Sequence, residues 1–135
     1  MPSDPDTPSS NDQGKDALRT VALVQGLFYA MTGFLPIVSM KTFQLITGPK
    51  RDLWLVQTVG ALITVIGGVL ALAGLRRRVA PEIRMLGVGS ALGLTAIDLV
   101  YYRRGVLGPV YVLDAVAELG LVSGWLLAGR VSRLR

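Results

Sequence analysis

The stretch LWLVQTVGALITVIGGVLALAGL, Leu53–Leu75, decides the fold of this chain because it contains no charged side chain. At about 1.5 Å of rise per residue, a helix of this length crosses the roughly 30 Å of hydrocarbon in a bilayer. A helix of a soluble protein needs a polar outer face, which this run lacks. The stretch therefore predicts a membrane-spanning helix.

Three further apolar runs flank this stretch, and together they predict four spans in a chain of 135 residues. The composition agrees, with 51% hydrophobic and only 17% charged residues. The predicted fold class is all-α, an integral membrane four-helix bundle covering residues 17–130. Its spans are expected at about 18–39, 53–75, 82–102 and 106–129.

The segments outside the spans are polar or basic. Residues 1–16 (MPSDPDTPSSNDQGKD) have too few apolar side chains to offset the entropy of ordering, so we expect a disordered, cytoplasmic N-terminal tail. Residues 131–135 form a short basic C-terminal tail. Residues 40–52 are the only long connection, and Phe43, Leu45 and Ile46 within it are expected to dip into the membrane interface.

The distribution of basic residues predicts the orientation of the spans. Nine lysines and arginines fall on the side of the two termini and the loop after residue 75, against five on the other side. Because basic residues favour the cytoplasmic side, we expect a multi-pass protein of the cell membrane, in a bacterial inner membrane, with both termini in the cytoplasm.

The chain contains no cysteine and no histidine. Thiolate chemistry, disulfides, c-type haem attachment and the usual zinc sites are therefore excluded, and we expect no metal site and no cofactor. The net charge of +5 comes from residues that flank apolar runs, so a nucleic-acid partner is not expected. The expected partners are the lipid bilayer, a small ligand or cation, and either a second copy of the chain or another membrane protein.

Three acids, Asp98, Asp114 and Glu118, lie inside predicted spans. Ionisable side chains in hydrocarbon cost several kcal/mol and are usually functional. One helical face of the last span carries Tyr111, Asp114, Glu118 and Trp125. A comparable face of the preceding span carries Ala91, Thr95, Asp98 and Tyr102.

If the two faces meet, they line an acidic cleft opening toward the outer side, at the level of Gln57. Low dielectric and neighbouring carboxylates both disfavour the charged form of an acid, so the cleft is a candidate site for a proton, a cation or a small amphipathic ligand.

Structural interpretations of the same residues stay open. Arginines and lysines at the outer rim could pair with Asp98, and protonated acids also serve as interhelical hydrogen-bond donors. Gly89 and Gly93, like Gly120 and Gly124, have the GxxxG spacing that permits close helix packing, within the bundle or between subunits.

In its four-span outline over residues 18–129, with acids in AIDLVYYRRG and VYVLDAVAELG, the chain resembles the DoxX-like and EXPERA-like small membrane proteins. The resemblance is architectural and assigns no residue roles. The resemblance to the EXPERA-like proteins implies that the membrane-embedded acids of this chain face an enclosed cavity.

Three functions remain in competition. The first is binding, with transport as its consequence, at the acidic cleft. The second is an accessory or assembly subunit without chemistry of its own. The third is a membrane-embedded enzyme that uses carboxylates as acid and base on a lipid-like substrate. Because the chain has no histidine and no cysteine, an enzymatic function is the least favoured of the three.

Overall fold

The computed structural model describes residues 10–47 and 52–133, and these residues form five helices. They are α1 (Ser10–Val38), α2 (Met40–Thr47), α3 (Leu53–Leu75), α4 (Pro81–Arg103) and α5 (Val110–Arg133). The predicted all-α class is confirmed. Four of the helices, α1, α3, α4 and α5, are long and apolar enough to cross a membrane.

The helix boundaries differ from the expected ones in three places. Residues 10–16, expected in a disordered tail, form the first two turns of α1, while residues 1–9 lie outside the described part of the chain. The last span starts at Val110 rather than at 106, because residues 104–109 form the turn after α4. The long connection contains α2, and residues 134–135 also lie outside the described part.

Local sequence explains how the second helical hairpin is built. Pro81 occupies the first turn of α4, where its missing N–H costs nothing, and Glu82 follows at the positive end of the helix. After α4, Gly105 adopts a φ of +75°, a conformation that glycine reaches without a steric penalty. The chain then reverses direction and enters α5.

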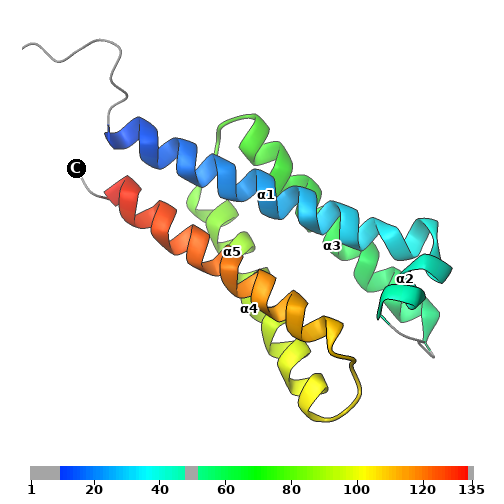
Figure 1. Ribbon diagram of the computed structural model, residues 1–135. Helices are drawn as coiled ribbons and strands as arrows, with labels where there is room; N and C mark the ends of the chain where they lie inside the picture. Colours follow the sequence, from blue (N-terminus) through cyan, green and yellow to red (C-terminus); the bar gives the residue numbers. More distant parts are fainter. Residues whose placement is uncertain (1–9, 48–51, 134–135) are drawn as a thin grey trace, which may run out of the picture.

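The short helix α2 is amphipathic, with Leu45 86% exposed and Ile46 56% exposed. Both side chains are large and apolar, and α2, which carries them, lies at the end of the molecule opposite the start of α1 and the end of α5 (Figure 1). A helix with these features suits the interface between headgroups and hydrocarbon. Trp54, at the start of α3, is exposed at the same end.

The helix α1 is the central element of the fold. It packs most extensively against α3 on one side and contacts α5 on another, while α4 pairs with α5 (Figure 1). Contacts between α3 and α4 are few. The molecule is therefore two antiparallel pairs, α1–α3 and α4–α5, joined along α1, and both described ends of the chain lie at the same end of the molecule.

A seam of glycines holds α1 against α3. A Cβ atom added at Gly26 would lie 2.5 Å from the amide nitrogen of Ala71, and one added at Gly67 would lie 2.6 Å from the carbonyl oxygen of Gly26. Two turns further along α1, Gly33 lies against Gly60 of α3 in the same way. Because the obstructing atoms are backbone, the helices approach this closely only where the side chain is a hydrogen atom.

The glycines expected to pack helices behave differently. Gly89, Gly93 and Gly120 have open space where a Cβ would stand, so they make no close helix approach within the described chain. Gly124 makes an ordinary contact with Val21. The glycines that pack α1 against α3 recur every seven residues, at positions 60, 67 and 74 of α3 and at 26 and 33 of α1.

We predict that Gly67→Ala destabilises the protein by about 1–3 kcal/mol or more, because the new methyl group would meet the backbone of α1. The matched control is Gly68→Ala at the next position, where nothing lies within 4 Å. That variant should be neutral or slightly stabilising, since alanine is the better helix former. Thermal unfolding in detergent measures both, and equal losses would contradict the glycine seam.

Candidate functional site

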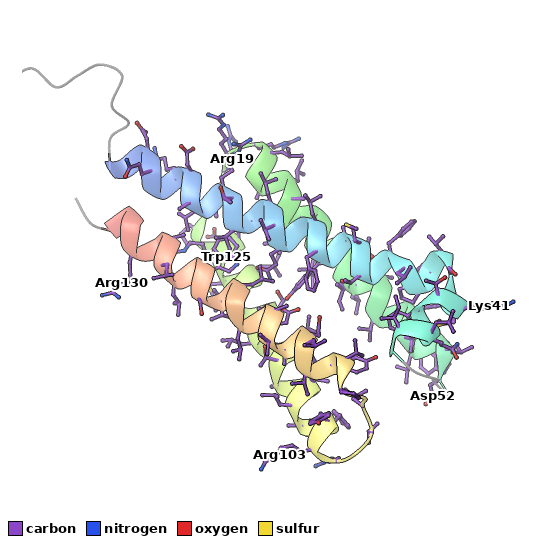
Figure 2. The ribbon with its side chains drawn as sticks, viewed as in Figure 1. Arg19, Lys41, Asp52, Arg103, Trp125 and Arg130 are labelled. Atoms are coloured by element: carbon purple, nitrogen blue, oxygen red, sulfur yellow. The ribbon has the colours of Figure 1, made fainter. Side chains whose placement is uncertain are left out.

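Polar side chains are buried where α1, α4 and α5 meet. Glu118 is 1% exposed, Tyr29 is 1% exposed and Gln25 is fully buried, and Asp98 and Thr95 are also buried. Trp125, which Figure 2 labels on α5, is buried in the same interior. A polar group removed from water must find a hydrogen-bond partner or a proton. The partners of these buried side chains therefore define the chemistry of the site.

The strongest link across the interior joins α1 to α5. The hydroxyl of Tyr29 donates a hydrogen bond of 2.6 Å to Oε2 of Glu118. This distance is at the short end for a hydroxyl bound to a carboxyl oxygen, as charge-assisted bonds are. The Tyr29 hydroxyl also lies within hydrogen-bonding reach of the Gln25 and Ser90 side chains.

Two carboxyl groups meet one turn closer to the α4–α5 turn. Asp98 of α4 and Asp114 of α5 lie within hydrogen-bonding reach of each other, and Glu118 is near enough to add its charge. The Oδ2 atom of Asp98 is buried and has no hydrogen-bond partner. Because ionised carboxylates only accept hydrogen bonds, a bond between these two groups requires a proton on one of them.

On the other side of Tyr29, the Gln25 side chain connects three helices. Its amide nitrogen donates to the carbonyl oxygen of Gly87 on α4 at 2.9 Å, and its amide oxygen accepts a 2.6 Å bond from Nε1 of Trp125 on α5. The Ser90 hydroxyl stands beside it and donates to the carbonyl of Leu86 at 2.6 Å. All the buried polar atoms at this level are therefore satisfied.

These groups form a column along the helix axes, which we call the polar column: Asp98, Asp114, Glu118, Tyr29, Gln25, Ser90 and Trp125. From Asp114 to Trp125 it extends about 16 Å, at 1.5 Å of rise per residue of α5. The acids lie at the end nearer the α4–α5 turn, and the amide and indole groups lie nearer the termini.

The structure brings together the three predicted acids but not all of their expected neighbours. Thr95 is buried one turn from Asp98, and its hydroxyl is satisfied by the carbonyl of Ala91 at 2.8 Å. Tyr102 is 42% exposed at the end of α4, and Gln57 is exposed on α3, which hardly contacts α4. Tyr111 is half-buried in the first turn of α5 and has a partner of its own.

The rim arginines within the described residues do not neutralise the acids. Arg103 and Arg104 are exposed, and the guanidinium of Arg104 lies over the ring of Tyr101, 5.7 Å from its centroid. No lysine or arginine of the described part of the chain pairs with Asp98, whose Oδ2 has no partner. Lys50 and Arg51 lie outside that part.

The sequence places Trp125 on the helix face of Asp114 and Glu118, but it does not identify the polar contacts that Ser90 and Trp125 make. Both lie on the same helix faces as the acids, Ser90 two turns before Asp98 and Trp125 two turns after Glu118. The signal was present in this spacing of seven or eight residues, which returns to one face of a helix after two turns. No sequence pattern shows that the amide oxygen of Gln25 accepts a hydrogen bond from the indole N–H of Trp125.

The described residues contain no group of three or more acidic, histidine or cysteine side chains arranged to hold a metal ion. The chemistry that the site offers is proton exchange among carboxyl and hydroxyl groups. Comparison of the chain with protein-family models, with curated proteins and with solved structures finds no match.

We predict that Tyr29→Phe lowers stability by about 1–2 kcal/mol, because it leaves Glu118 buried without its donor. The matched control is Tyr101→Phe, since Tyr101 is exposed and its hydroxyl is in no buried contact. Reversible unfolding in mixed micelles compares the two variants. If both lose the same stability, the Tyr29–Glu118 bond does not link α1 to α5.

Substitution of Gln25 by leucine should change the environment of Trp125. The variant removes the acceptor of the indole N–H, so we expect a blue shift of tryptophan emission together with a loss of about 1–3 kcal/mol of stability. The measurement is made in a Trp54→Phe background, which leaves a single tryptophan. Emission unchanged from the parent would show that the Gln25–Trp125 bond does not form.

Proposed function

We propose that this chain is an integral protein of the cell membrane, a four-helix bundle with both termini in the cytoplasm. Support for the spans comes from the length and apolar character of α1, α3, α4 and α5. The two described ends lie at the same end of the molecule, as four spans require (Figure 1). The excess of basic residues at that end, nine against five, supports its cytoplasmic placement.

Within this bundle, the carboxyl cluster of Asp98, Asp114 and Glu118 binds a proton. The observation that carries the proposal is the contact between the buried Asp98 and the half-buried Asp114, with Oδ2 of Asp98 left as an unpartnered acceptor. Two carboxyl groups in contact share a proton, and the free oxygen is where a second donor would bind. Membrane-embedded acids of this kind are typical of proton pathways.

The size of the site favours a proton over a larger occupant. The Asp98 and Asp114 carboxyl groups already lie within hydrogen-bonding reach, and the Tyr29 hydroxyl occupies the adjoining position on Glu118. A metal cation or an amine would have to displace one of these contacts. Binding of such a cation or a small amphipathic ligand is therefore a secondary form of the same proposal, in which the ligand exchanges with the shared proton.

The polar column gives the bound proton a direction in which to move. From the carboxyl pair the column continues through Glu118 to the hydroxyls of Tyr29 and Ser90, near the middle of the bundle. A proton can pass along carboxyl and hydroxyl groups by successive donation, each group releasing one proton as it accepts the next. Proton-coupled transport is the function that would use this arrangement.

The test is an infrared titration of the carboxyl groups in lipid, on wild type and on the Asp98→Asn, Asp114→Asn and Glu118→Gln variants. We expect Asp98→Asn and Asp114→Asn to remove the same protonated-carboxyl band, because the two groups share one proton. Glu118→Gln should shift that band without removing it.

The matched control for the titration is Asp52→Asn, since Asp52 is exposed at the start of α3. Its substitution should leave the shared band unchanged. Two independent bands, each lost with only one aspartate, would contradict the proposal, as would acids that stay ionised throughout the titration. The acids would then serve as interhelical contacts only.

A second candidate function, an accessory subunit, is favoured by one observation. Gly89, Gly93 and Gly120 leave smooth, open positions on the outward faces of α4 and α5, where a helix of another protein or of a second copy could approach closely. In that case, Gly93→Leu would abolish recovery of a partner or of the dimer while leaving the carboxyl titration intact. A monodisperse monomer with wild-type behaviour in both assays would exclude this function.

A further inference from the structure

A groove of about 600 Å³ runs along α4 and α5 at the end of the molecule that carries the termini. Two arginines, Arg84 and Arg130, line it together with Ser123, Leu126, Leu127 and Gly129. The leucines are about 60% exposed, so the groove has an apolar wall open to the surroundings and a basic end. Figure 2 shows Arg130 extending away from α5 at that end.

The two arginines have no acidic partner among the residues that the structure describes, and neither takes part in the polar column. Their distances from the middle of the helices place the two arginines near a membrane surface. At 1.5 Å per residue, Arg84 lies about 12 Å and Arg130 about 13 Å from the middle of their helices, near the half-thickness of the hydrocarbon. Their guanidinium groups therefore reach the level of the lipid phosphates.

The packing of Gly129 holds Arg84 in this position. The guanidinium of Arg84 lies directly over Gly129 of α5, in the space that a Cβ atom would occupy. A second hollow, of about 450 Å³, is lined by Arg84 together with Pro81, Met85, Val88 and Gly89. Arg84 thus lines two hollows, each with apolar residues in its wall.

We propose that this groove binds an anionic phospholipid, with the phosphate between Arg84 and Arg130 and an acyl chain along Leu126 and Leu127. Guanidinium groups match phosphate oxygens in geometry as well as in charge. Basic pockets between helices at the cytoplasmic surface suit anionic headgroups. The proposal depends on the membrane placement given above, but not on proton binding by the carboxyl cluster.

The experiment measures lipid preference in nanodiscs of phosphatidylcholine with increasing phosphatidylglycerol, with retained lipid counted by native mass spectrometry. Wild type should enrich phosphatidylglycerol in its bound shell. Arg84→Gln and Arg130→Gln should each weaken this enrichment by about fivefold, the effect of one basic residue at an anionic surface. The control Arg78→Gln removes a charge at the same end, outside the groove, and should have little effect.

A second variant separates geometry from charge. Gly129→Ala keeps both arginines but displaces the Arg84 guanidinium, so it too should weaken the enrichment. Equal losses in Arg78→Gln and Arg84→Gln would overturn the proposal in favour of a general surface charge. Thermal stabilisation of the detergent-solubilised protein by inorganic phosphate, as large as that by a short-chain phosphatidylglycerol, would show that the groove takes free phosphate instead.

Discussion

The rest of the structure depends on the need to satisfy Glu118 inside an apolar interior. On insertion scales, an acid at the middle of a membrane helix costs roughly 2.5–3.5 kcal/mol, and α5 carries Glu118 near its middle and Asp114 in its second turn. The helix is stable in a bilayer only when other helices receive its polar face. Tyr29 supplies the donor for Glu118, Asp98 faces Asp114, and Gln25 binds the indole of Trp125. The polar side chains therefore determine which helices are neighbours.

The glycine seam makes this arrangement sterically possible. Because α1 lies in close contact with α3 through Gly26, Gly33, Gly60 and Gly67, the neighbouring face of α1 presents Gln25 and Tyr29 to α4 and α5. Packing alone would allow one pair of helices to slide or rotate against the other. Directional hydrogen bonds from two successive turns of α1 set the register, and α3 takes almost no part in the site.

The four apolar runs could be predicted from the sequence because length and the absence of charge are enough to define a span, as in α3. The acids could be singled out because each is rare in such a run. The glycine seam was not predicted, because the expected packing motif has a four-residue spacing, whereas the glycines between α1 and α3 recur every seven residues. Gln57 was expected beside the acids because it lies at the same depth in the membrane. Depth does not show which helices are neighbours, and α3 hardly contacts α4. The first turns of α1 were missed because their composition is polar.

The central claim is that Asp98 and Asp114 share a proton in the interior of the bundle. Solid-state NMR of the protein in lipid, with carbon-13 in the aspartate carboxyl groups, tests it directly, because the carboxyl shift reports protonation and the dipolar coupling reports proximity. We expect the two carboxyl carbons to be close and coupled, with one of the two groups carrying a proton. Two uncoupled carboxylates, both ionised at every pH at which the protein is folded, would contradict it.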